Sequence, residues 1–225
     1  MTRSILFDTE TTGLDPITGD RILEIACLEL DNDLPTGITF HRVIDPQRDI
    51  PEEAARIHGI RAEQVRGKPL FADIVDDLMD FIGDGTLVAH NAPFDFGFLN
   101  AELGRLKRAP ISRSRMVDTL ALAKTRFPGM PNSLDALCRR FGIDLSERTS
   151  HNALLDCKLL AEVYIELTGG RQRGLSLASD SQGSMQIATY SSEGPRIARP
   201  IIPSAAERDA HAAFVAKLKE PVWNI

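Results

Sequence analysis

Short apolar stretches separated by turn residues mark the first part of the chain and are typical of β-strands. Residues 4–8, 21–30 and 37–44 are predicted as three strands, and the last one ends at Asp45-Pro46, because proline cannot donate a hydrogen bond to a sheet. The short turns between these strands indicate that the sheet starts with antiparallel pairs. A fourth short strand is predicted at residues 86–90.

Apolar residues recur at helical spacing in much of the sequence that follows. Gly83 and Gly142 are expected to end two helices, and Ser133 stands where a helix begins. Strands first and helices after, with a later strand between them, indicate an α/β domain. The predicted helices cover residues 70–82, 93–107, 118–126, 133–141 and 152–168.

The pattern changes after the domain that we expect at residues 1–169. Residues 170–204 are dominated by Gly, Ser, Gln, Arg and Pro and lack apolar periodicity, which predicts a flexible linker. Helical spacing resumes in residues 205–225, and Ser204 is a fair N-cap for that helix. A lone helix after a linker does not fold by itself, so it either docks on the domain or waits for a partner.

Composition is that of an ordinary globular protein, with 43% hydrophobic and 26% charged residues. No apolar stretch approaches the ~20 residues of a membrane span, and the N-terminus is too short and acidic for a signal peptide. We therefore expect a cytoplasmic protein without a membrane segment. The three cysteines, Cys27, Cys138 and Cys157, have no Cys-x-x-Cys spacing and are expected to be buried, reduced thiols.

The net charge of −6 is unevenly distributed. Residues 170–225 hold seven Lys/Arg and five Asp/Glu, whereas the other 169 residues hold 19 and 27. A protein that binds nucleic acid without a partner usually carries a basic surface, and the composition of this chain does not provide one. Either the protein does not bind nucleic acid, or its acidic residues are concentrated in a metal site and a partner protein provides the contacts that hold the nucleic acid.

Asp8 and Glu10 form the first candidate site, directly after the first predicted strand. Alternate residues of an extended chain project to the same side about 6–7 Å apart, so both carboxylates can reach one cation. Carboxylate oxygens suit Mg²⁺ or Mn²⁺. Taken alone, an Asp-x-Glu pair is more often a solvated strand end.

Asp95 follows the fourth predicted strand and lies in the first turns of a predicted helix. An acid there complements the positive end of the helix dipole, which is a sufficient structural role. Three aromatic neighbours, Phe94, Phe96 and Phe98, nevertheless give Asp95 an apolar setting, in which a carboxylate needs a partner or a metal.

His151 and Asp156 form the third candidate site. A separation of five residues does not place two side chains on one helical face. We expect His151 in the loop before the last helix of the domain, and Asp156 one turn inside it, pointing inward with the apolar stripe. The structural alternative is a capping-region histidine and an exposed aspartate.

Together these residues give the pattern Asp-x-Glu, Asp and His-x₄-Asp, which resembles the DEDD exonucleases of the His-containing subclass over about residues 3–169. The resemblance implies a ribonuclease H-like mixed sheet flanked by helices, and release of nucleoside 5′-monophosphates from a 3′ end. It also implies two divalent cations, Mg²⁺ or Mn²⁺, with His151 as the general base for the attacking water. The implied metal ligands are Asp8, Glu10, Asp95 and Asp156.

Three further residues are candidates for contact with the substrate. Backbone N–H groups near Thr11 are placed to hold the terminal nucleotide, and His58 and Asn91 are placed to line its groove. Three other acids are interpreted as capping or surface residues: Asp118, Asp135 and Asp144.

Several segments, among them residues 127–129, 132–138 and 153–164, resemble the epsilon proofreading subunits of bacterial DNA polymerase III. This resemblance implies that the substrate is a DNA 3′ end and that the C-terminal helix docks on the catalytic alpha subunit. A tether to a polymerase would also raise the effective concentration of the 3′ end for an acidic nuclease.

The linker contains a candidate peptide for the sliding clamp. Gln172, Leu175 and Leu177 match the Gln-x-x-Leu-x-Leu pattern by which such subunits contact the clamp, and residues 182–187 are a second, weaker candidate. Apolar anchors on a flexible peptide are suited to filling a pocket on a partner.

Two other functions remain open from the sequence. An RNA-trimming 3′→5′ exonuclease of the same fold would carry the same five site residues. A non-catalytic assembly module would use only the fold and the tail, and such a protein would be expected to have lost part of the site.

Overall fold

The computed structural model describes residues 3–148, 150–169 and 202–218. Its centre is a five-stranded mixed sheet with the strand order β3-β2-β1-β4-β5. The β1–β2 and β2–β3 pairs are antiparallel, whereas β1–β4 and β4–β5 are parallel. The antiparallel start predicted from the sequence is therefore confirmed. The strands are β1 (Arg3–Thr11), β2 (Ile22–Asp31), β3 (Leu34–Val43), β4 (Thr86–Ala89) and β5 (Met116–Asp118).

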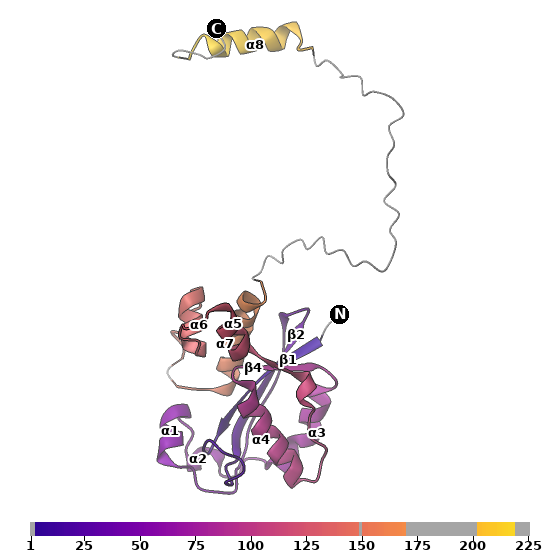
Figure 1. The fold of residues 1–225 in the computed structure, drawn as a ribbon, viewed down its shortest axis with the longest axis vertical. Helices are drawn as coiled ribbons and strands as arrows, with labels where there is room; N and C mark the ends of the chain where they lie inside the picture. Colours follow the sequence, from indigo (N-terminus) through magenta and orange to yellow (C-terminus); the bar gives the residue numbers. More distant parts are fainter. Residues whose placement is uncertain (1–2, 149, 170–201, 219–225) are drawn as a thin grey trace, which may run out of the picture. The chain divides into compact units, whose positions relative to one another are not determined.

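Helices cover both faces of this sheet (Figure 1). Every helix predicted within residues 1–169 is present, with ends shifted by a few residues. Caps explain several of these ends: the Asn152 and Ser133 side chains each accept a hydrogen bond from the first turn of their helix. The helices of the domain are α1 (Glu52–His58), α2 (Ala62–Val65), α3 (Phe71–Ile82), α4 (Ala92–Arg105), α5 (Thr119–Arg126), α6 (Leu134–Phe141) and α7 (Ala153–Leu167).

The alternation of side chains along β1 builds one core on each face of the sheet. Ile5 and Phe7 point to the face covered by α3 and α4, where the Phe7 and Phe96 rings lie edge to face at 5.6 Å. Leu6 points to the opposite face, where Leu160 of α7 belongs to the same buried cluster. Because β1 is buried on both faces, the residues at its end are held in a fixed position.

One strand and two α-helices of the fold were not expected from the sequence. Strand β5 has three residues and α2 has four, which is too short for a periodic pattern. Helix α1 carries usable signals, namely Pro51 before its first turn and Gly59 with φ 76° at its end, but only two of its residues are buried. The predicted strand at residues 37–44 in fact starts at Leu34.

The sheet reverses its order between β1 and β4. From β1 the chain continues to β2 and β3 on one side, whereas β4 and β5 lie on the other side. The carboxyl ends of the parallel strands β1 and β4 therefore lie side by side at a point where the connections diverge. Such a point leaves a crevice, and ligands bind there in open α/β sheets.

Helix α8 (Ala205–Val215) belongs to a second unit of the chain and is described by itself. Its start is a capping box, in which Ser204 and Glu207 satisfy each other's backbone N–H groups. Phe214 is 59% exposed on this helix. Within the described residues, no helix has the length and apolar character needed to span a membrane.

We predict that Leu160→Ala lowers the free energy of unfolding by about 2–5 kcal/mol, because it leaves a cavity between α7 and the sheet. Leu160 is 1% exposed, whereas Leu122 of α5 is 40% exposed. The matched control Leu122→Ala should change the free energy by less than about 1 kcal/mol. Urea unfolding of the full chain, followed by circular dichroism, measures both, and equal losses would contradict the assignment of this core.

Candidate active site

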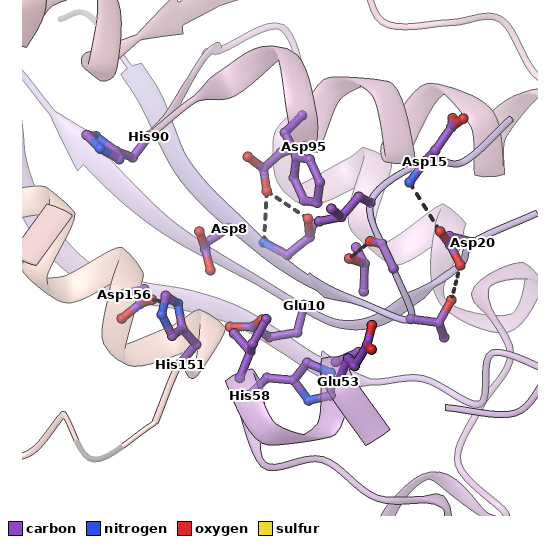
Figure 2. Close-up of a pocket in the computed structure, with 18 of the residues that line it drawn as sticks. Asp8, Glu10, Asp15, Asp20, Glu53, His58, His90, Asp95, His151 and Asp156 are labelled. Atoms are coloured by element: carbon purple, nitrogen blue, oxygen red, sulfur yellow. Dashed lines mark hydrogen bonds and ion pairs between the residues drawn. The ribbon is translucent and has the colours of Figure 1, made fainter. Parts of the chain in front are cut away.

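A cavity of about 840 Å³ opens at the carboxyl ends of β1 and β4. Its lining includes all five residues of the sequence pattern, which come from three distant parts of the chain. Figure 2 shows their side chains turned toward a common space. These residues are Asp8 and Glu10 of β1, Asp95 of α4, His151 of the loop before α7, and Asp156 of α7.

Asp8 and Glu10 lie on the same face of β1, as the strand period requires. Helix α7 packs on that face and brings Asp156 toward both carboxylates (Figure 2). The pairing of β1 with β2 shifts register between Glu10 and Thr11, so the regular strand ends directly after the two acids. The strand thus delivers both carboxylates at its end, where the cavity begins.

Asp95 reaches the cavity from the other face of the sheet. One of its oxygens, Oδ1, accepts hydrogen bonds from the Thr9 backbone N–H at 3.1 Å and from the Thr9 hydroxyl at 2.7 Å. Thr9 lies between Asp8 and Glu10 and points to the α4 side, so one strand positions three of the acids. The partner expected for a carboxylate in this apolar setting is therefore Thr9.

The N-terminus of α7 is anchored to the sheet by a buried carboxylate. Glu24 of β2 is 2% exposed, and it accepts hydrogen bonds from the Asn152 side chain at 3.1 Å and from the Ala153 backbone N–H at 3.3 Å. His41 Nε2 lies 2.6 Å from the same carboxylate. This network fixes the start of the helix directly after His151. Glu24 was not singled out in the sequence, because a single acid inside a strand carries no pattern.

Arg148 forms the densest set of polar contacts in the cavity. Its Nε and Nη2 donate to the two oxygens of Asp156, each at 2.7 Å, and its Nη1 donates to Asp135 Oδ1 at 2.6 Å. Burial alone would raise the pKa of Asp156, but the hydrogen bonds from Arg148 and His151 hold that pKa below its ordinary value. Asp135 stands in the first turn of α6 with 39% of its side chain exposed, as its interpretation as a capping or surface residue implies, and it also lines the cavity.

The other three carboxylates repel one another in a buried setting. Burial, followed by the charges of Asp95 and Glu10, raises the pKa of Asp8 well above its ordinary value. Burial and the charge of Asp156 raise the pKa of Glu10 to about 8. Burial also raises the pKa of Asp95 to about 7, although the hydrogen bonds from Thr9 oppose this shift. Such a cluster is stabilised by bound cations.

The donor set fits a divalent cation. Ligand atoms of Glu10, His151 and Asp156 lie within 4.8 Å of one another, and Asp8 lies beside them (Figure 2). Carboxylate oxygens favour Mg²⁺ and Mn²⁺, whereas the buried thiols Cys138 and Cys157, which would favour zinc, are not cavity residues. The cavity therefore suits hard divalent cations.

The three candidates for substrate contact have different surroundings. His58 lines the cavity; its Nδ1 accepts the Ile60 backbone N–H at 3.0 Å, and its buried Nε2 has no hydrogen-bond partner among the described residues. Thr11 also lines the cavity, but its hydroxyl donates to the Gly13 carbonyl at 2.6 Å. Asn91 is exposed and is not among the lining residues. Asn91 instead holds a left-handed conformation before α4, and the preceding residue, His90, lines the cavity.

Asp118 is a cap, as the sequence indicated. Its Oδ1 accepts hydrogen bonds from the backbone N–H groups of Leu120, Asn91 and Ala92. One carboxylate therefore joins the starts of α4 and α5. Asp144 is exposed and bonds only locally, to Ser146.

The rim of the cavity is partly apolar. Leu14 of the β1–β2 loop is 82% exposed, Ile57 of α1 is 53% exposed, and Phe94 of α4 lines the same cavity. The loop is held by Asp20, which accepts hydrogen bonds from the Thr12 hydroxyl and the Asp15 backbone N–H. The cavity thus combines an acidic floor with apolar side chains at its mouth.

Comparison with known proteins agrees with this geometry. The family model described as Exonuclease matches residues 5–164. The DNA polymerase III subunit epsilon of Rickettsia felis is 47% identical over 221 residues, which cover 96% of each chain. That of Salmonella typhimurium is 44% identical, covering 94% of this chain and 91% of its own. The chain belongs to the exonuclease family of DNA polymerase III epsilon subunits.

Solved structures of exonucleases have the same fold. Exonuclease X in complex with 5′ overhanging duplex DNA is 28% identical, with a TM-score of 0.59, and covers 75% of this chain and 91% of its own. The nuclease domain of 3′hExo, a DEDDh family member bound to rAMP, is 19% identical, with a TM-score of 0.63 and coverages of 76% and 94%. The protein is a 3′→5′ exonuclease with the ribonuclease H-like fold predicted from the sequence.

We predict that the metal-free protein loses stability as the pH rises from about 5 to 8. In this window folded Glu10 and Asp95 remain protonated up to pKa values of about 8 and 7, whereas they ionise near pH 4 in the unfolded chain. The folded state then binds more protons than the unfolded state, so the free energy of unfolding falls with pH. Melting temperatures in EDTA across this range measure the effect.

The matched control is Glu10→Gln, which removes one of the titrating groups and should flatten the decline. Burial lowers the pKa values of His58 and His90, so these histidines make the free energy of unfolding rise with pH. Both proteins contain the two histidines, so the difference between their pH profiles reports on the acid. Parallel pH profiles of the two proteins would contradict the prediction.

Proposed function

We propose that this protein is the proofreading exonuclease of a bacterial replicative DNA polymerase. It hydrolyses the terminal phosphodiester bond at a DNA 3′ end and releases a nucleoside 5′-monophosphate. The observation that carries the proposal is the convergence of four carboxylates and one histidine on a single cavity. The relatives named as epsilon subunits, 44–47% identical over nearly the whole chain, support the assignment to a polymerase.

In this proposal the four carboxylates hold two Mg²⁺ or Mn²⁺ ions. Asp8, Glu10 and Asp156 on the α7 face and Asp95 on the α4 face would hold these ions. When bound, such ions lower the pKa of the attacking water and neutralise charge on the phosphate and the leaving 3′ oxygen. The acids themselves orient this chemistry and provide no proton transfer.

His151 is proposed to accept the proton of the attacking water. Its side chain is 49% exposed, and it faces the cavity from a loop whose next residue caps α7. Its Nδ1 lies 3.4 Å from Asp156 Oδ2, so the carboxylate can stabilise the imidazolium that forms. Imidazole is the side chain that most often serves as a general acid or base in enzymes.

The rim of the cavity supports a role in holding terminal nucleotides. Leu14, Ile57 and Phe94 offer apolar surface to the faces of bases, which stack on such side chains without regard to sequence. His58 lines the same cavity. A frayed end enters such a cavity at lower cost than a paired one, because no base pair has to be broken.

The proposed partners follow from the tail. We assign α8 to the polymerase alpha subunit, because it exposes Phe214 and carries little buried surface within the described residues. Gln172, Leu175 and Leu177 are proposed to bind the sliding clamp, and they lie outside the residues that the structure describes, as does the alternative peptide at 182–187. The proposal places the protein in the cytoplasm with the chromosome.

We predict that the purified protein degrades a 5′-labelled single-stranded DNA into a 3′→5′ ladder in Mg²⁺, and that EDTA abolishes the ladder. Asp8→Asn and His151→Ala should each lower the rate by about 10²–10⁴-fold, because one removes a cation ligand and the other the proton acceptor. Asp144→Asn, an exposed acid outside the cavity, is the matched control and should retain full activity.

A matching RNA oligonucleotide runs beside the DNA. Faster cleavage of RNA would replace the proposal with an RNA-trimming function. Absence of cleavage of either substrate by a folded protein would leave an assembly module as the better account.

The tail assignments predict separable losses. Replacing Gln172, Leu175 and Leu177 together by alanine should abolish binding to the clamp, whereas Phe214→Ala should weaken binding to the alpha subunit by about tenfold or more. Cleavage of single-stranded DNA should be unchanged in both variants. Surface plasmon resonance with immobilised clamp or alpha subunit measures these effects, and retained clamp binding would move the assignment to residues 182–187.

A further inference from the structure

Among the described residues that line the cavity, Arg148 alone carries a permanent positive charge. Its side chain is only 9% exposed, although it lies in the loop before α7. All three nitrogens of the guanidinium form hydrogen bonds. Nε and Nη2 donate to Asp156, Nη1 donates to Asp135, and Nη2 also lies 3.0 Å from His151 Nδ1. This is a built position for the guanidinium, not a surface side chain in a chance contact.

The pairing covers the same atoms that a cation needs. A guanidinium that donates to both oxygens of a carboxylate forms one of the stronger and more directional ion pairs in proteins. Asp156 is 4% exposed, so loss of these bonds would leave a buried carboxylate that water solvates poorly. A divalent cation that binds Asp156 meets a guanidinium that already bonds both carboxylate oxygens, so the two positive charges compete for the same carboxylate.

The same contact engages His151. Arg148 Nη2 lies 3.0 Å from His151 Nδ1, the same atom that faces Asp156 Oδ2, so the imidazole can donate to Asp156 only when the contact with the guanidinium opens. Arg148 thus holds the proposed proton acceptor and one proposed cation ligand in a single arrangement. Asp135, whose side chain is 39% exposed, gives the guanidinium a second carboxylate partner. Arg148 can keep this ion pair when Asp156 binds the cation.

We propose that Arg148 is a positioning residue that occupies the place of a cation, holding Asp156 and His151 together and competing with the divalent ion for Asp156. This inference rests on the proposed function, because it takes Asp156 as a cation ligand. Two consequences follow. Arg148 stabilises the acidic cavity when no cation is present, and it sets the affinity for the cation below the value that the acids alone would give.

The test is the binding of Mn²⁺ alone to the full-length protein, measured by isothermal titration calorimetry and by the loss of the free-ion paramagnetic resonance signal. Arg148→Gln should tighten Mn²⁺ binding by about tenfold, because the competing charge and both hydrogen bonds are lost. The same variant should melt at a lower temperature in EDTA and gain more from saturating Mn²⁺ than the wild type does. A residue that only supports the fold would lower stability without tightening the metal site.

The chain offers a matched control in Arg21. Its Nε and Nη2 donate to the two oxygens of Glu102, a carboxylate that is 2% exposed and lies outside the cavity. Arg21→Gln therefore removes the same kind of ion pair, and it should lower the melting temperature equally with and without Mn²⁺ and leave the affinity unchanged. If Arg148→Gln does not fold, Arg148→Lys keeps the charge but loses the paired hydrogen bonds, and it should tighten binding by a smaller factor.

Unchanged or weaker Mn²⁺ binding in the folded Arg148 variants would overturn the inference while leaving the proposed function intact. Absence of Mn²⁺ binding to the wild-type protein would instead overturn the two-cation function, and the inference with it. The wild-type titration therefore separates the two failures.

Discussion

The mutual repulsion of four carboxylates in one cavity is the constraint on which the rest of this structure depends. Burial raises the pKa values of Asp8, Glu10 and Asp95, so holding these acids together costs folding free energy. The chain meets this cost with rigid support: β1 is buried on both faces, and the acids stand at its end. The electrostatic repulsion is thus concentrated in the cavity, where bound cations would offset it.

Two connections complete the site from opposite sides of the sheet. Helix α4 brings Asp95 to Thr9 on one face, and α7 brings Asp156 to the other face. Because Glu24 of β2 binds the start of α7, the position of His151 depends on a strand more than a hundred residues earlier in the chain. Glu24, which does not line the cavity, thus helps to position residues that do.

The acidic balance of the chain is consistent with this arrangement. Of the two interpretations left open by the net charge, the structure favours a metal site, since the acids gather in one cavity where Arg148 is the only permanent cation among the described lining residues. Such an enzyme attracts a polyanionic substrate weakly by itself. The proposed tether to a polymerase would raise the local concentration of the DNA end.

The sequence by itself predicted the five residues that the structure brings to one cavity and most of the elements that carry them. Alternation in β1 placed Asp8 and Glu10 on one face, and the spacing of His151 and Asp156 separated loop from helix, because both follow from local backbone periodicity. Tertiary structure alone decided what lies opposite each group. Arg148 and Glu24 carry no periodic signal, and Asn91, which was expected to line the groove, instead holds a left-handed conformation while His90 lines the cavity. Contacts between residues far apart in the chain depend on packing, which local patterns do not encode.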